Sequence, residues 1–266
     1  MLLDAIVIIL RETIEAGVLI SVLLSMANRQ HVKTRWLWLG LALGIIGSII
    51  YMKNIEIMSA WFEYVGQEII NAFMQYLIFF ALFFLITFFQ FSRSEKAWSL
   101  HWLMTVIVTL ALIREGAEVL MFYSGFWITE SGVVNPLTSG FVGLMIGASL
   151  GAIFYYLLML LPERIAVFTQ RLLLVLIAAG MVAQATQLLI QADWLPTATP
   201  LWNTTSWLPE QSVLGTLAYA VLGYEATPSG LQVGFYGGAL AIMLMGVFIN
   251  HFLCGKQVLA IRNMSS

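Results

Sequence analysis

Cysteine and charged residues are scarce in this chain of 266 residues. The single cysteine, Cys254, excludes an internal disulfide framework and any CxxC zinc or redox motif. Only 10% of the residues are charged, whereas a soluble domain usually has about 25%. The formal net charge of −2 offers no basic surface to a nucleic acid. These scarcities argue against a disulfide-stabilised domain, a soluble protein and a nucleic-acid-binding protein.

Hydrophobic residues make up 61% of the chain, and the mean hydropathy is +0.91. A transmembrane helix needs about 20 predominantly apolar residues. Seven stretches qualify, although the second is short: about 2–26, 36–52, 69–91, 102–127, 137–161, 170–191 and 232–253. The sequence therefore predicts an all-α polytopic membrane protein with seven transmembrane helices in a single membrane domain, residues 1–266. The first stretch has no basic n-region and no small-residue cleavage site, so we expect a span of the mature protein rather than a signal peptide.

The basic residues of the loops predict the orientation, because lysine and arginine accumulate in cytosolic loops. Nine fall on one predicted side: Arg29, Lys33, Arg35, Arg93, Lys96, Arg164, Arg171, Lys256 and Arg262. The opposite side has Lys53 alone. We therefore expect the N-terminus outside and the C-terminus in the cytosol. The membrane is expected to be the cytoplasmic (inner) membrane of a bacterium, or the plasma membrane of a eukaryote.

The motif RETIE, beginning at Arg11, recurs as REGAE, beginning at Arg114. Each charged residue of the first motif has its equivalent 103 residues later. Each copy of the repeat contains three spans, and because three is odd the two copies must enter the membrane from opposite sides. The predicted order is repeat A (about 1–97), repeat B (about 98–193), an outer loop (about 192–231) and the seventh helix (about 232–253).

Glycines spaced by four residues accompany the repeat. Gly40 and Gly44 lie in the second span, and Gly143, Gly147 and Gly151 lie in the fifth. Small residues at this spacing let helix backbones approach closely, so we expect a packing role. The outer loop holds one apolar segment, residues 212–224, which is too short to span the membrane. It is expected to be re-entrant, to lie at the interface, or to cap the outer mouth.

Six charged residues fall in the middle of predicted spans: Arg11, Glu12, Glu15, Arg114, Glu115 and Glu118. Within each motif the two glutamates are at positions i and i+3 and share one helix face. Each mid-membrane charge costs roughly 2.5–3.5 kcal/mol, and this cost argues against a purely structural role. Four carboxylates and two guanidinium groups leave a net charge of −2. Such a cluster is expected to bind a proton or a cation, and an all-carboxylate site suits hard ions such as Mg²⁺, Ca²⁺, Mn²⁺ or Fe³⁺.

Other polar residues lie near the outer ends of spans. Glu68, Asn71 and Gln75 share one face of the third span, and Gln184, Gln187 and Gln191 share one face of the sixth. Glu225 lies in the outer loop. Glu68, Asn71, Gln75 and Glu225 are candidates for an outer relay that passes a cation inward. Interhelical hydrogen bonds, or a solvated surface for Glu225, are the alternative interpretation.

Two REXXE motifs in the first and fourth of seven spans resemble those of the oxidase-dependent iron transporter family, the fungal high-affinity iron permeases and their bacterial EfeU-like relatives. The stretches AAGMVAQA (178–185) and LGTLAYAVLGYEATPS (214–229) add to the resemblance, which covers nearly the whole chain. Relatives often carry a further acidic residue near the start of the third span, where this chain has Asn71.

The resemblance implies uptake of Fe³⁺ delivered by an oxidising partner, either a multicopper ferroxidase or a periplasmic haem peroxidase. It implies that Glu12, Glu15, Glu115 and Glu118 bind iron during its passage, and that Arg11 and Arg114 tune or gate the site. Iron is then the transported substrate. We expect no permanently bound cofactor, no catalytic residue and no enzymatic activity; membrane lipid is the other partner.

Three alternatives remain at this stage. The same carboxylates suit a transporter of another hard cation or a proton-coupled carrier. A membrane-embedded di-metal oxidoreductase is disfavoured because helical di-iron sites use Glu-x-x-His pairs, which this chain lacks. A purely structural subunit would tolerate charge-neutral replacement of both motifs.

Overall fold

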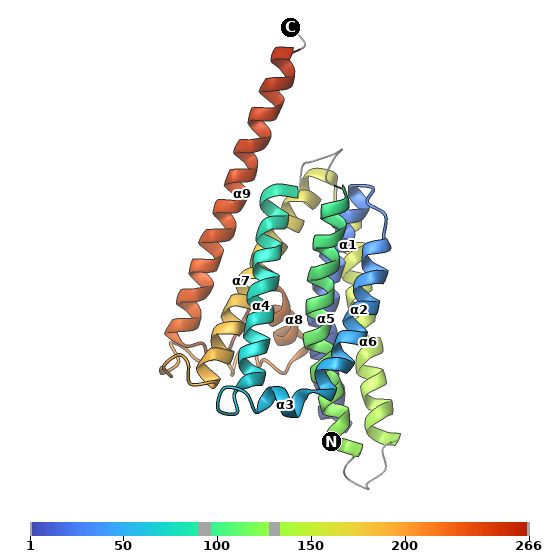
Figure 1. Ribbon diagram of the computed structural model, residues 1–266, viewed down its shortest axis with the longest axis vertical. Coiled ribbons are helices and arrows are strands. Elements are labelled where there is room, and N and C mark those ends of the chain that lie inside the picture. Colours follow the sequence, from blue (N-terminus) through green and yellow to red (C-terminus); the bar gives the residue numbers. More distant parts are fainter. Residues whose placement is uncertain (1, 90–96, 128–133, 265–266) are drawn as a thin grey trace.

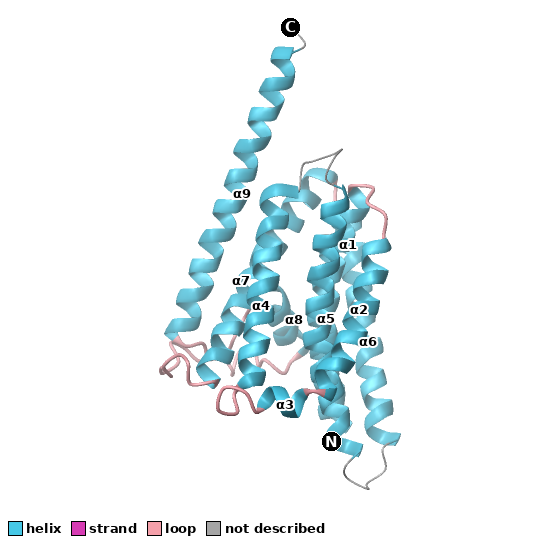
Figure 2. Ribbon diagram, viewed as in Figure 1, coloured by secondary structure: helices cyan, strands magenta, loops and turns pink. Residues whose placement is uncertain are grey.

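The computed structural model describes residues 2–89, 97–127 and 134–264. Apart from one isolated antiparallel bridge between Pro200 and Ser229, all regular structure in these segments is helical (Figure 2). The elements are α1 (Leu2–Arg29), α2 (Arg35–Lys53), α3 (Ile55–Ser59), α4 (Gly66–Phe84), the π-helical turn η1 (Leu85–Phe89), α5 (Ala97–Trp127), α6 (Val134–Leu160), α7 (Glu163–Gln191), α8 (Val213–Leu222) and α9 (Gly230–Met264).

The long helices run roughly along one direction, with the loops gathered at the two ends of the bundle (Figures 1 and 2). Five helices of the described segments are long and apolar enough to cross a membrane: Arg35–Lys53, Gly66–Phe88, Leu137–Leu160, Glu163–Gln191 and Gly230–His251. The other two long helices, α1 and α5, carry the charges of the RETIE and REGAE motifs in their middle. The chain is therefore a multi-pass membrane protein. A membrane crossing by all seven long helices stays a prediction.

The packing of the long helices is reciprocal. The most extensive contacts join α1 to α6 and α2 to α5, while α4 packs against α7. The first helix of the predicted repeat A thus packs on the second helix of repeat B, and the first helix of repeat B packs on the second of repeat A. At the centre, α1 also contacts α5 directly. This contact brings the two motif-bearing helices together.

Glycines form the two long helix contacts, as the sequence predicted. A Cβ atom added at Gly44 of α2 would lie 2.5 Å from the Leu112 side chain of α5. One added at Gly147 of α6 would lie 2.7 Å from the Thr13 side chain of α1. Ser21 and Ser48 add hydrogen bonds across the same contacts. The Ser21 hydroxyl donates to the carbonyl oxygen of Gly151 at 2.7 Å, and Ser48 to that of Leu112 at 2.7 Å.

The long loop between α7 and α9 folds back onto the bundle and carries α8. The Ser212 hydroxyl accepts from the Gly215 N–H at 3.0 Å, which caps the N-terminus of α8. Gly223 ends the helix in the left-handed region, with φ of 65°, where glycine has no steric cost. At the start of α9, Ser229 and Gln232 exchange hydrogen bonds of 2.7 and 3.3 Å as a capping box. The apolar segment predicted at 212–224 is thus a short helix that packs against α7 and α1.

Candidate metal-binding site between the two REXXE motifs

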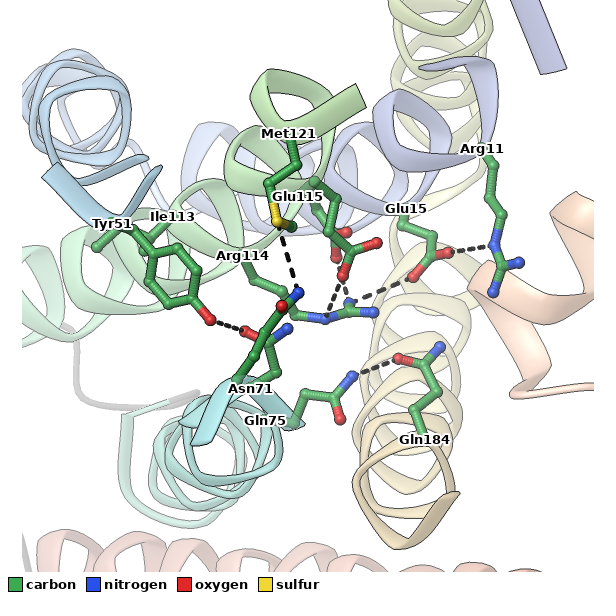
Figure 3. Close-up of polar contacts among 12 residues, drawn as sticks. Arg11, Glu15, Tyr51, Asn71, Gln75, Ile113, Arg114, Glu115, Met121 and Gln184 are labelled. Atoms are coloured by element: carbon green, nitrogen blue, oxygen red, sulfur yellow. Dashed lines mark hydrogen bonds and ion pairs between the residues drawn. The ribbon is translucent and has the colours of Figure 1, made fainter. Parts of the chain in front are cut away.

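Arg114 lies where α1 and α5 cross and contacts three carboxylates. Its Nη1 is 3.5 Å from Oε2 of Glu15 on α1, and it also pairs with the neighbouring Glu115. Its Nε is 3.8 Å from Oε1 of Glu118, one helical turn further along α5. The Arg114 side chain is 8% exposed. Figure 3 shows Arg114 between Glu115 and Glu15, so a single buried guanidinium group joins the two motifs.

Three glutamates from the two motifs form a compact group of oxygen donors. One carboxylate oxygen each from Glu12, Glu115 and Glu118 lies within 4.8 Å of the others. Oxygen ligands that share one ion at 2.0–2.6 Å are at most about 5 Å apart, so this spacing fits a common cation. Glu12 and Glu115 are buried, and Glu118 is half-buried.

Two oxygens of this group lack a hydrogen-bond partner within the described part of the chain: Oε2 of Glu12 and Oε2 of Glu115. A buried carboxylate oxygen without a partner is costly unless a proton or a cation satisfies it. All donors of the group are carboxylate oxygens, the ligand type that hard cations prefer. The arrangement can therefore bind a hard cation.

Arg11, the repeat equivalent of Arg114, lies in a different environment. Its Nε donates to Oε1 of Glu15 at 3.2 Å, so Glu15 bridges the two arginines (Figure 3). Its guanidinium carbon lies 4.3 Å from the centre of the Tyr219 ring on α8. The Arg11 side chain is 41% exposed, against 8% for Arg114. The site is thus asymmetric although its two motifs are equivalent in sequence.

A small cavity adjoins the motif residues. Its walls come from α1, α5, α7 and α8: Glu15, Ala16, Leu19, Ala111, Glu115, Ile177, Gly180, Met181, Gln184, Tyr219 and Ala220. Two of the motif glutamates, Glu15 and Glu115, face this cavity. Sequence reasoning did not identify Tyr219 as a site residue. No periodicity of the sequence marks it, because it reaches the site only through the folding back of α8.

An amide pair lies beside the carboxylates, between α4 and α7. The Gln75 Nε2 donates to the Gln184 Oε1 at 2.7 Å, and Gln75 is fully buried (Figure 3). The two outer polar stripes predicted from the sequence thus meet, and Gln184 extends the pair into the cavity. Asn71 is occupied elsewhere, since its Oδ1 accepts from the Tyr51 hydroxyl at 3.0 Å.

The two acidic candidates for an outer relay lie apart from the three-carboxylate group. Glu68 is half-buried in the first turn of α4. Glu225 accepts a hydrogen bond from the Gln232 side chain in the loop before α9. Burial, and secondarily the charge of Glu210, raise the pKa of the Glu225 carboxyl to about 7. The structure thus brings the six motif residues together and leaves Glu68 and Glu225 outside them.

A comparison with protein families finds a match to nearly the whole chain. The model of the iron permease FTR1 family matches residues 2–260. No curated protein and no solved structure matches the chain. The matched range includes both REXXE motifs, the amide pair and α8.

Proposed function

The chain belongs to the iron permease FTR1 family, a family of iron transporters, and we propose that iron crosses the membrane through the site where the two REXXE motifs meet. The observation that carries this proposal is the buried group of Glu12, Glu115 and Glu118, whose oxygens lie within 4.8 Å of one another. Glu15 is the fourth carboxylate, placed to enter the coordination shell when it is released from Arg11 and Arg114.

Charge supports iron as the occupant of this site. The four motif glutamates and two motif arginines carry a net charge of −2 when all are ionised. Binding of Fe³⁺ changes the charge of the four carboxylates from −4 to −1, which weakens their attraction for both guanidinium groups. Because Arg114 pairs with three carboxylates, arrival of the ion requires that it give up at least some of these contacts. Ion occupancy and arginine position are thereby coupled.

The ligand chemistry supports Fe³⁺ as the delivered ion. An all-oxygen, anionic site favours the harder ion, Fe³⁺, over Fe²⁺. An oxidising partner on the outer side, a ferroxidase or a haem peroxidase, then supplies the substrate. The outer candidates Glu68, Gln75 and Glu225 are expected on the side from which the ion enters, whereas Asn71 is bound to Tyr51.

The predicted inverted repeat suggests how the transport cycle proceeds. The reciprocal packing of α1 with α6 and of α2 with α5 supports two equivalent halves related across the site. Transporters of this layout bind substrate at the midplane and expose it alternately by movement of one half against the other.

The decisive experiment is uptake of radiolabelled iron by cells that express Glu15→Gln or Glu118→Gln. Each substitution keeps the side-chain size and removes one charge from the site. We expect uptake at low iron concentration to fall by more than about tenfold, in keeping with the loss of a metal-site group. Glu56→Gln is the matched control, because Glu56 is exposed on α3 outside the site. Wild-type uptake by both site variants at equal membrane abundance contradicts the proposal.

A second experiment separates iron from other hard cations and Fe³⁺ from Fe²⁺. Purified protein in liposomes is supplied with Fe²⁺ or Fe³⁺ in the presence of excess Mn²⁺, Mg²⁺ or Ca²⁺. Selective Fe³⁺ uptake supports the proposal in full. Efficient Mn²⁺, Mg²⁺ or Ca²⁺ transport through the same glutamates, or a transport rate set by the proton gradient alone, favours the alternative of a different hard cation or a proton-coupled carrier.

A further inference from the structure

The two motif arginines are equivalent in the sequence repeat but not in the structure. Arg114 is buried and pairs with Glu15, Glu115 and Glu118. Arg11 pairs with Glu15 alone and stacks on the ring of Tyr219. Something outside the repeat must therefore break the symmetry of the site.

The element that breaks the symmetry is α8, which belongs to neither repeat. This helix is inserted in the loop between α7 and α9 and packs against α7 and α1. Its position on α7 is closely defined, since a Cβ atom at Gly180 would lie only 2.8 Å from the Cα of Gly223. The equivalent connection, between α4 and α5, has only the π-helical turn η1 in its described residues. It therefore supplies no helix that could place an aromatic ring against Arg114 as α8 places Tyr219 against Arg11.

Tyr219 has two roles in the geometry. Its ring lies under the Arg11 guanidinium at 4.3 Å, a cation–π distance, and its side chain lines the same cavity as Glu15 and Glu115. Cation–π attraction also acts at partly exposed sites such as this one, where the Arg11 side chain is 41% exposed. Tyr219 therefore gives Arg11 a binding position outside the carboxylate group.

The alternative position for Arg11 is the carboxylate group itself. Among the described residues, the buried Oε2 atoms of Glu12 and Glu115 have no hydrogen-bond partner and would attract a second guanidinium group through a low-dielectric environment. A guanidinium group in that position occupies the place of a metal ion and cancels the charge that attracts it. The affinity of the site for a cation thus depends on where Arg11 is held.

We propose that Tyr219 is a positioning residue that holds Arg11 away from Glu12, Glu115 and Glu118 and so keeps this group open to the metal ion. The proposal rests on the proposed function, because it assigns Tyr219 a role in iron binding at the same site. The feature that positions Arg11 is the aromatic ring, not the hydroxyl group.

The test compares two substitutions at Tyr219. Tyr219→Phe keeps the ring, and we expect a KM for iron uptake within about twofold of wild type. Tyr219→Leu removes the ring, and we expect the KM to rise roughly tenfold, with a smaller change in maximal rate, because Arg11 then competes with iron for the carboxylates. Tyr219→Met, another ring-free side chain that adapts to its surroundings, carries the same expectation if the leucine variant does not reach the membrane.

A double substitution isolates the role of Arg11. In an Arg11→Gln background no guanidinium group is available to move inward, so adding Tyr219→Leu should leave the KM of that background unchanged. A merely structural role of Tyr219 would instead raise the KM by the same factor in both backgrounds. Thermal unfolding of each purified variant in detergent checks that the fold is retained.

Three results would overturn the proposal: an unchanged KM in Tyr219→Leu, an equal defect in Tyr219→Phe, or a full leucine effect in the Arg11→Gln background. Its failure is distinguishable from failure of the proposed function. If Tyr219→Leu transports normally while Glu15→Gln does not, only the role of Tyr219 is wrong. If Glu15→Gln transports normally, the site assignment itself fails.

Discussion

Glu225 is an acidic residue of the loop between α8 and α9 whose ionisation is suppressed. Its carboxyl group is half-buried, accepts a hydrogen bond from Gln232 and lies near Glu210. Burial and the neighbouring charge raise its pKa from 4.5 to about 7, while the Gln232 hydrogen bond and Arg11 oppose the rise. Glu210 is itself engaged, since its Oε1 accepts from the Ala226 N–H at 2.6 Å.

A raised carboxyl pKa makes the folded state less stable at higher pH. Between pH 4.5 and about 7 the unfolded chain has ionised at this position and the folded chain has not, so the folded state binds the extra proton and stability falls as pH rises. Glu225→Gln removes this dependence. We expect its Tm in detergent to fall less than that of wild type between pH 5 and pH 7.5. Parallel curves for the two proteins would show that Glu225 does not contribute.

Much of the site could be predicted at the residue scale, because mid-membrane charges are rare and costly. RETIE and REGAE predicted that six charged groups meet, and they do. The asymmetry could not be predicted, since Arg11 and Arg114 have the same charged neighbours within their motifs. It arises from Tyr219, whose approach depends on how a long loop folds back. The Gln75–Gln184 pair is an intermediate case. The sequence indicates that both residues are polar positions near the ends of spans, but it does not predict their hydrogen bond.

At the scale of elements, each of the seven predicted spans overlaps a long helix. Most predicted ends lie within a few residues of the observed helix ends. The length of each apolar stretch determines where these helices lie, and that length can be read directly from the sequence. The short helix α3 and the π-helical turn η1 were not predicted. The turn depends on a distant partner, because Asn250 of α9 donates to the Thr87 carbonyl oxygen at 2.8 Å. Such local departures from α-helix are set by tertiary contacts rather than by local sequence.

The contact between α7 and α8 depends on two glycines. A Cβ atom at Gly180 would lie 2.8 Å from the Cα and 3.1 Å from the N of Gly223, both backbone atoms that cannot rotate away. Gly180→Ala is therefore expected to destabilise the protein by about 1–3 kcal/mol, as overpacking does, and to lower iron uptake by displacing Tyr219. Thermal unfolding and uptake measure the two effects.

Gly237→Ala is the control for this substitution. Gly237 is also a helical glycine, but a Cβ atom there meets nothing within 4 Å. Because alanine favours helix over glycine by roughly 0.5–1 kcal/mol, this control should be neutral or slightly stabilising. Equal stability of the two variants would show that the Gly180–Gly223 approach is not tight.

At the scale of the whole molecule, the N-terminus and the C-terminus lie at opposite ends of the helical bundle (Figure 1). The loop that joins α1 to α2 lies at the C-terminal end, and the loops around α3 and α8 lie at the other. The basic residues of the first loop predict that the C-terminal end faces the cytosol. This orientation is a prediction from the distribution of charge.

Cysteine labelling tests the orientation, with Cys254→Ser as the background because Cys254 is the only cysteine. Trp207 is 91% exposed in the loop before α8, and Lys33 is exposed in the loop after α1. An impermeant maleimide should label Trp207→Cys in intact cells. It should label Lys33→Cys only after the membrane is opened. The reverse pattern would invert the topology and place the α8 side of the site toward the cytosol.

The reciprocal packing has a consequence for biogenesis. In the described segments α1 and α2 scarcely touch each other; their partners are α6 and α5, which the ribosome makes later. On the predicted topology, the glycine face of α2 and the charges of α1 are therefore inserted before α5 and α6, the helices that they contact. On this predicted topology, Arg11, Glu12 and Glu15 then have only one another, at the membrane depth where unpaired charge is most costly. Assembly is consequently completed by the second half of the chain, which supplies both helix partners and Arg114.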